Sequence, residues 1–201
     1  MKEEDAWSSC HSDDLWIFDK LILSKKLGYI CGPAEVSVPK SGHYIVRPCV
    51  NLAGMGIGAE ICFLEKGKDK VPAGYFWCEI FKGRHLSADY EIDHKSRSIH
   101  QGLTVEGFRD PNNPLWKFDR WIRVYDRLKI NFILKQLKGS YKTINCEFIG
   151  GKLIEMHLRS NKDMGIHSEI IPVWRGESTQ PPKGFLYYED EDFNRIGFFK
   201  R

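Results

Sequence analysis

The sequence predicts an α+β protein built on antiparallel sheets. Short apolar segments of strand length follow one another along most of the chain, and tight glycine turns separate several of them, as in antiparallel hairpins. Two segments, 15–23 and 118–138, have apolar positions that suit helices instead. A length of 201 residues, with 42% hydrophobic and 28% charged residues, is typical of one folded domain of ordinary size.

Charge and hydropathy limit the classes of partner. The 30 basic and 27 acidic residues are spread along the chain without a long basic run, so nucleic-acid binding is not expected. The N-terminal residues Met1–Asp5 lack the apolar core of a signal peptide, and no apolar run approaches the roughly 20 residues that cross a bilayer. A cytoplasmic protein without a membrane segment is therefore expected.

The six cysteines lie far apart in the sequence, and several fall in apolar, strand-like segments. Cysteine behaves there as a small hydrophobic residue, so buried free thiols are predicted. A zinc site could draw on Cys78, His85, His94 and His100, but their spacing lacks the close pairs that preorganise tetrahedral ligands.

The chain begins with a polar, acidic segment that leads into a helix. Ser12–Asp14 are predicted to cap this helix, which covers 15–23 and stops near Gly28. It is the first predicted regular element.

Two strands are predicted next, over 43–48 and 60–65, with a glycine-rich loop between them. The loop contains Gly54, Gly56 and Gly58. Glycines leave backbone N–H groups free to approach phosphate oxygens. Because the loop leads into a strand and lacks a following Gly-Lys-Ser/Thr, it is neither a dinucleotide fingerprint nor a P-loop. The alternative is a hairpin that needs glycines only for its turn.

Segments 74–81 and 84–90 are predicted to form a strand, a tight turn at Lys82-Gly83 and a second strand. The bulky apolar residues of the first strand could form a wall for an adenine, or they could simply belong to the core. Residues 91–115 are predicted to be loops, with one short strand near Leu103.

The clearest predicted helix covers 118–138, because apolar residues recur there at intervals of three and four and Gly139 follows. After it, segments 144–149 and 152–158 are predicted to form a hairpin, since Gly150-Gly151 admits the positive φ angles of a tight turn.

The hairpin carries carboxylates on both strands. Glu147 lies on the first strand, and Glu155 and His157 lie two residues apart on the second, which puts them on one face. Converging carboxylates suit Mg²⁺, and Arg159 at the next two-residue step would face phosphates. The alternative is a solvated polar face.

The glycine loop, the segment after it and the carboxylate hairpin, in this order, resemble the ATP-grasp superfamily, which includes D-alanine ligase, glutathione synthetase and the biotin carboxylases. The likeness covers about residues 19–161 and begins with Asp19-Lys20, a helix, Gly28 and Val38-Pro39. It implies two α+β subdomains whose antiparallel sheets grip a nucleotide between them.

The resemblance also implies site residues. ATP would be bound by Lys20, Arg47, Gly54, Gly56, Gly58, Glu79, Ile80, Phe81 and His85. Mg²⁺ would be bound by Glu147, Glu155 and His157, and Arg47 and Arg159 would be the catalytic cations. Two of these residues depart from the family pattern: His157 stands where asparagine is usual, which is less suited to Mg²⁺, and Arg47 replaces lysine.

Only about 18 residues precede Asp19, so the resemblance implies a minimal member without the usual N-terminal substrate domain. Residues 1–18 would be an N-terminal extension, and 19–201 the ATP-grasp-like domain. The acceptor would be held by the loops at 91–117, by the tail after 160, or by a partner protein.

The function implied by the resemblance is an ATP- and Mg²⁺-dependent ligase that joins a carboxylate to an amine through an acylphosphate, with both substrates unidentified. One alternative is a non-catalytic ATP-binding or interaction module of degenerate ATP-grasp fold. Another is a nucleic-acid-associated protein that stacks bases on Trp116, Trp121 and Trp174.

Overall fold

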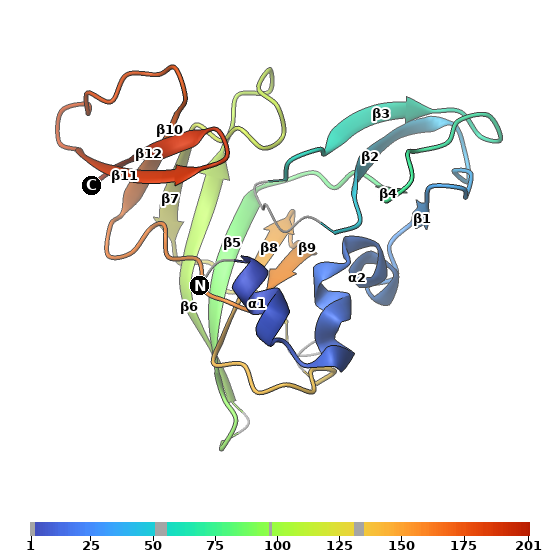
Figure 1. Ribbon diagram of the computed structural model, residues 1–201, viewed down its shortest axis with the longest axis horizontal. Helices are drawn as coiled ribbons and strands as arrows, with labels where there is room; N and C mark the ends of the chain where they lie inside the picture. The colour runs from blue at the N-terminus through green and yellow to red at the C-terminus, as the bar shows by residue number, and fades with distance from the viewer. Residues whose placement is uncertain (1–2, 51–55, 97, 131–134) are drawn as a thin grey trace.

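A computed structural model describes residues 3–50, 56–96, 98–130 and 135–201. The described residues form two antiparallel sheets, one of four strands and one of eight, and the N-terminal helices lie beside both (Figure 1). The predicted α+β class and the antiparallel sheets are confirmed.

The four-stranded sheet has the order β1-β4-β2-β3. Its strands are β1 (Cys31–Pro33), β2 (Gly42–Pro48), β3 (Glu60–Leu64) and β4 (Tyr75–Cys78). Side chains alternate along β2, as expected for a half-buried strand. Tyr44 and Val46 pack with Trp77 in a core on one face, while Ile45 belongs to a second core that includes Leu21 of the helix at 20–26.

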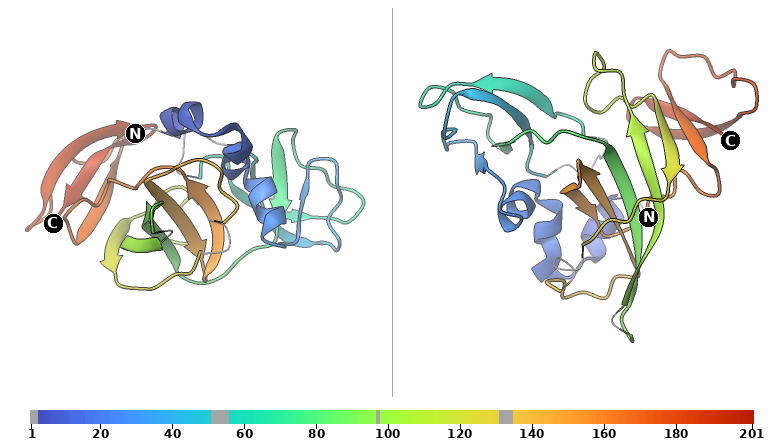
Figure 2. Two further views of the ribbon diagram at one scale, coloured as in Figure 1. Left: turned by 90° about the horizontal axis from the view of Figure 1, so that it is seen from below. Right: turned by 180° about the vertical axis from the view of Figure 1, so that it is seen from behind.

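The eight-stranded sheet has the order β11-β12-β10-β7-β6-β5-β8-β9. Its strands are β5 (His85–Asp93), β6 (Ser98–Phe108), β7 (Arg120–Val124), β8 (Thr143–Ile149), β9 (Lys152–His157), β10 (Glu169–Trp174), β11 (Leu186–Asp192) and β12 (Arg195–Lys200). The sheet is strongly twisted and curved, so β10–β12 stand apart from β8 and β9 (Figure 2).

Three short helices precede the sheets: α1 (Glu3–Ser9), the 3₁₀ helix η1 (Ser12–Phe18) and α2 (Lys20–Lys26). The single helix predicted over 15–23 is wrong, because the Asp19 carboxylate accepts a hydrogen bond from the Ile22 N–H at 3.0 Å and so caps a new helix. The α2 helix ends at Lys26 with Leu27 as its C-cap, and Gly28 follows with φ +73°, as expected.

The predicted capping role of Ser12–Asp14 is also wrong. His11 is the N-cap of η1. The buried Asp14 carboxylate instead accepts hydrogen bonds from the backbone N–H groups of Lys138 and Gly139 and from the Tyr141 hydroxyl.

The largest core lies under β5, β8 and β9. It includes Ala6 of α1 and Ile17 and Phe18 of η1, packed against strand residues such as Tyr90 and Ile144. The N-terminal residues thus contribute to the main core.

The helix predicted over 118–138 is the largest error. Arg120–Val124 form β7, which pairs with β6 on one side and with β10 on the other. Its aromatic and β-branched residues suit a strand, and these long-range partners override the local helical spacing. The described residues after β7 follow an irregular path rather than a helix.

Two further predictions are corrected. The short strand predicted near Leu103 is confirmed but is longer than expected: it is β6, an 11-residue strand that pairs with β5 and replaces much of the loop predicted over 91–115. The hairpin predicted across Lys82-Gly83 does not form, because β4 belongs to the small sheet and β5 to the large one. Residues 79–84 connect the sheets instead.

The predicted strands at 43–48 and 60–65 and the hairpin at 144–158 are confirmed as β2, β3 and β8–β9. The hairpin turn has φ +56° at Gly150 and +78° at Gly151, which is the backbone of a tight two-residue turn. None of the helices in the described part of the chain is long and apolar enough to cross a membrane.

Candidate functional site

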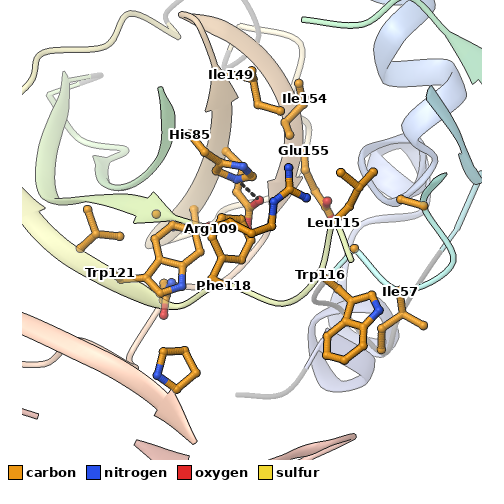
Figure 3. Close-up of a pocket in the computed structure, with 18 of the residues that line it drawn as sticks. Ile57, His85, Arg109, Leu115, Trp116, Phe118, Trp121, Ile149, Ile154 and Glu155 are labelled. Carbon is orange, nitrogen blue, oxygen red and sulfur yellow. Dashed lines mark hydrogen bonds and ion pairs between the residues drawn. The ribbon is translucent and has the colours of Figure 1, made fainter. Parts of the chain in front are cut away.

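A cleft of about 1190 Å³ lies between the two sheets. Its walls come from β2 and its following loop, from the connection 79–84, from β8 and β9, and from the β6–β7 loop with β10 and β12. Figure 3 shows part of this wall, from Ile57 across to Trp121. The cleft brings together residues from nearly the whole length of the sequence.

The connection between the sheets offers free backbone groups to the cleft. The Glu79 N–H donates to the Ile30 carbonyl at 2.9 Å, and the Ile30 N–H donates to Glu79 Oε1 at 2.8 Å. Ile80 and Phe81 also line the cleft, but their N–H and C=O groups bond to no residue that the structure describes. Unpaired backbone donors and acceptors of this kind suit the edge of a flat heterocycle.

Two cations, the buried Lys20 and the half-buried Arg47, face the same space. Lys20, the first residue of α2, is 4% exposed, and its Nζ lies 2.9 Å from Glu155 Oε1. Arg47 on β2 donates from Nη2 to the Ile154 carbonyl at 3.2 Å, and its buried Nε has no hydrogen-bond partner among the described residues. Burial lowers the pKa of Arg47, and the charges of Glu155 and Glu147 oppose that effect.

The predicted glycine loop joins β2 to β3. Gly54 lies outside the described residues. Gly56 lines the cleft with φ +63°. Gly58 has φ +79° but is absent from the described cleft wall, and it packs close to Tyr75 and Pro48.

The two predicted carboxylates stand directly opposite one another. Glu147 on β8 pairs in register with Glu155 on β9, and both line the cleft. The His85 Nε2 donates to Glu147 Oε2 at 3.1 Å. Burial by itself would raise the pKa of Glu147, but the hydrogen bond from His85 and the charges of His85, His157 and Lys20 lower that pKa to about 2.

His157 is surrounded by carboxylates. Its Nδ1 lies 2.9 Å from Glu3 Oε1, and its Nε2 lies 3.7 Å from Glu155 Oε1 and 3.9 Å from Glu147 Oε1. Burial would lower the pKa of His157, but the bond to Glu3 and the charges of Glu155, Glu3 and Glu147 raise it above 6.5. The contact with Glu3 is an ion pair rather than a well-aligned hydrogen bond, because the Nδ1 has no hydrogen-bond partner among the described residues.

Arg159 follows β9 and lies next to His157. Its Nε donates to Glu3 Oε2 at 2.6 Å. Burial would raise the pKa of Glu3, but His157 and Arg159 lower it. A carboxylate from α1 is therefore held by both of these residues.

Glu147 and Glu155 are the candidate ligands for a metal ion in the cleft. Within the described residues, no group of three or more His, Cys, Asp or Glu side chains has metal-binding geometry. Glu147 and Glu155 nevertheless supply the hard oxygen atoms that Mg²⁺ prefers, and they face each other across one ladder position. The two carboxylates fit Mg²⁺; His157 is engaged with acids through both ring nitrogens.

Sequence reasoning missed Glu3 and Asn145. Glu3 was placed in an extension, and nothing local indicates that it reaches Arg159. Asn145 on β8 is 2% exposed and donates to Ser87 and Asp89. Its two-residue spacing from Glu147, on the same face of the strand, was the available signal.

Comparison with known proteins identifies solved structures with a similar fold but no similar sequence. No protein-family model matches the sequence, and no curated protein matches it significantly. Among solved structures, N5-carboxyaminoimidazole synthetase from Staphylococcus aureus complexed with ADP aligns with a TM-score of 0.60 at 12% identity, over 92% of this chain and 67% of that one. An L-amino acid ligase from Bacillus licheniformis aligns with a TM-score of 0.55 at 10% identity, over 92% and 66%.

An ATP-grasp superfamily protein from Archaeoglobus fulgidus aligns with a TM-score of 0.54 at 14% identity. The alignment covers 92% of this chain and 64% of that protein, so the chain spans slightly less than two thirds of its length. These likenesses show that the chain has an ATP-grasp-like fold.

Proposed function

We propose that this chain, with its ATP-grasp-like fold, binds ATP and Mg²⁺ in the cleft between its sheets and joins a carboxylate to an amine. The observation that carries the proposal is the convergence of Lys20, Arg47, Glu147 and Glu155 on one cleft. Cations for phosphates and carboxylates for a divalent metal are what an ATP site requires.

The adenine is assigned to the connection between the sheets. The free N–H and C=O groups of Ile80 and Phe81 would pair with its edge. Phe81 is fixed for this role, because its ring packs edge-on against Tyr29 at 4.6 Å. Glu79 holds Ile30 with its side chain, so its part in binding is to position the connection.

The phosphates are assigned to Lys20, Arg47 and the glycine loop. The unpaired Nε of Arg47 is the donor that a phosphate oxygen would satisfy. Glu147 and Glu155 would hold Mg²⁺, which supplies charge stabilisation to the phosphates when bound. Gly54 and Gly58 remain proposed members of the loop, and His85 positions Glu147.

In the proposed reaction an oxygen of the substrate carboxylate attacks the γ-phosphorus, and the bond from that phosphorus to the β,γ-bridging oxygen breaks to release ADP. The amine nitrogen then attacks the acyl carbon, loses a proton, and phosphate leaves. Arg47 and Arg159 would stabilise the negative charge that these steps develop.

One observation favours a second function, a non-catalytic ATP-binding module. Arg159 is held by Glu3 and His157 is enclosed by acids, so neither is free to meet a substrate in this arrangement. Such a module would bind ATP but form no ADP when carboxylates and amines are supplied.

The experiment is calorimetric titration of ATP with and without Mg²⁺ into the wild type and into Glu155→Gln. We expect the variant to lose at least tenfold in Mg²⁺-dependent affinity. Glu91→Gln, at an exposed position on β5, is the matched control. A wild type that does not bind ATP in millimolar Mg²⁺ would refute both functions, and ADP formation would separate them.

A further inference from the structure

The cleft continues past the carboxylates to an end built largely of aromatic residues. This aromatic end is formed by Trp116, Phe118 and Trp121 from the β6–β7 region, with Trp174 of β10 and Phe193 of the β11–β12 turn. A site for one small ligand typically has about 300–1,000 Å³, so the 1190 Å³ of the whole cleft leaves room for a second molecule.

The rings of the aromatic end are held in place by one another. Phe118 and Trp121 lie 4.4 Å apart between centroids with a tilt of 39°, and Trp116 packs edge-on against Trp174 at 5.2 Å. The indole N–H of Trp174 donates to the Phe118 carbonyl. A wall fixed in this way presents a ready apolar surface to a flat ligand.

The turn between β11 and β12 contributes the aromatic ring of Phe193, whose backbone is strained. Phe193 has φ +53°, the only positive φ of a non-glycine residue in the described part of the chain. Its ring lies 6.0 Å from Trp116. Backbone strain in a bulky residue persists where the surrounding structure uses it, and here it places an aromatic ring at the mouth of the aromatic end.

The aromatic end also contains an arginine, Arg109, that pairs with none of the described residues. The other cleft arginines have partners. Arg47 donates to the Ile154 carbonyl, while Arg84 pairs with Glu106 and Asp126, Arg159 with Glu3, and Arg195 with Asp163 and Asp190. Arg109 is half-buried and lines the cleft with Phe118 and His85 (Figure 3). It makes no hydrogen bond or ion pair with any residue that the structure describes.

The aromatic end adjoins the proposed metal carboxylates. The His85 ring packs edge-on against Phe118 at 5.0 Å and against Trp121 at 5.6 Å, and the same ring bonds to Glu147. A molecule seated on the aromatic wall would therefore lie next to the place assigned to the reacting phosphate.

We propose that the aromatic end binds a carboxylate with a flat apolar body, whose carboxylate pairs with Arg109 and whose body packs on Trp116, Phe118 and Trp121. The guanidinium fork matches a carboxylate with two parallel hydrogen bonds. The identification of this molecule as the substrate to be ligated rests on the proposed function; its binding does not, because no residue of the aromatic end belongs to the ATP site.

The test uses phenylacetate as the compound titrated into the full chain by calorimetry. Acetate has the carboxylate without the ring, and 2-phenylethanol has the ring without the carboxylate. We expect phenylacetate to bind at least tenfold more tightly than either. Arg109→Gln should remove the advantage over 2-phenylethanol, and Trp116→Ala the advantage over acetate.

Two further variants keep the result decisive. Arg109→Lys retains the charge but not the fork and should bind with intermediate affinity. Arg175→Gln, at an exposed arginine on the turn after β10, should bind phenylacetate like the wild type. Equal affinity for the three compounds, or an Arg109→Gln variant that keeps the full preference, would overturn the proposal.

ATP titrated separately into the wild type distinguishes the two proposals. Phenylacetate binding without ATP binding would support the carboxylate site at the aromatic end and refute the ligase function. ATP binding without any preference for phenylacetate would support ATP binding in the cleft and refute the carboxylate site. A single-stranded oligonucleotide that binds and displaces phenylacetate would also overturn the inference, because it would assign the rings to nucleobases.

Discussion

His157 shows how one residue can change the electrostatics of a site. Both of its nitrogens face carboxylates, and its pKa is raised by them despite burial. An asparagine at this position would bring no charge. The imidazolium therefore occupies, beside Glu147 and Glu155, the region where a divalent cation would need negative potential.

His157→Asn should lower the Mg²⁺ concentration at which ATP binds by several-fold. The substitution removes the imidazolium charge, which competes with Mg²⁺ for Glu147 and Glu155. Calorimetric ATP titrations at several Mg²⁺ concentrations would measure the shift. His43→Asn, at an exposed position, is the control, and its ATP binding should depend on Mg²⁺ as in the wild type. A variant that requires more Mg²⁺ would identify His157 as a ligand.

The raised pKa of His157 also makes stability depend on pH. Its ion pairs contribute stability that is complete below pH 6.5 and is lost as the pH rises through the raised pKa of the folded state. The free energy of unfolding of the wild type should exceed that of His157→Asn most at pH 6. The difference should narrow by pH 9 in urea titrations; a difference that widens with pH would contradict the assignment.

At the scale of elements, the turn of the β8–β9 hairpin contacts the connection between the sheets. A Cβ on Gly150 would lie 2.1 Å from the Lys82 carbonyl oxygen, whereas a Cβ on Gly151 would meet nothing within 4 Å. Both glycines have positive φ. Substitutions at both glycines strain the backbone, but only a substitution at Gly150 also collides with the connection. Comparing the two therefore separates the effect of strain from that of steric contact.

Gly151→Ala should cost about 1–2 kcal/mol of unfolding free energy from strain alone, and Gly150→Ala should cost more, because the connection must also move. Urea titration would measure both. Gly150→Ala should further weaken ATP binding through displaced Ile80 and Phe81, while Gly151→Ala should not. Equal effects of the two variants would exclude a role for the contact.

The elements that could be predicted from the sequence are those whose signals are local. The β8–β9 turn needs two residues with positive φ, and Gly150-Gly151 supplies them. By contrast, the strand conformation of β7 depends on its pairing with β6 and β10. Neither partner lies within the few residues around Trp121 from which a helical pattern is read. The placement of β4 in the small sheet depends on β1 and β2, which lie more than twenty residues before it, while β5 pairs with β6 and β8 rather than with β4. The local sequence around Lys82-Gly83 shows neither fact and predicts a hairpin.

The residues of the candidate site also differ in whether a local sequence signal could predict their positions. Glu147 and Glu155 could be placed on facing strands from the hairpin alone, and Arg47 from its strand and motif. Their direct pairing could not, because it depends on a register shift between Glu147 and Phe148. Glu3 reaches Arg159 across 156 residues of sequence, and the aromatic end gathers residues from three separate elements. Neither arrangement has a local pattern, because only the folded sheets bring the parts together.

At the scale of the whole molecule, ATP in the cleft would touch both sheets and stabilise them together. With ATP and Mg²⁺ at about one hundred times the dissociation constant, linkage adds about 2.7 kcal/mol, which for a chain of this size raises the melting temperature by about 5–10 °C. Calorimetry or fluorescence melting would measure the shift. Glu155→Gln should largely abolish it, and an unchanged shift in that variant would argue against the proposed metal site.

The pairing of Ile30 with Glu79 has a mechanical consequence. Ile30 lies where the chain enters the four-stranded sheet and Glu79 lies where it leaves, and two hydrogen bonds tie these points together. A body attached at two adjacent, linked points can turn about the line through them but cannot slide or swing freely in other directions. Rocking of the small sheet over the cleft would therefore turn mainly about this line, against the Arg47–Ile154 hydrogen bond that also joins the two sheets, with the adenine edge assigned to Ile80 and Phe81 close to the axis.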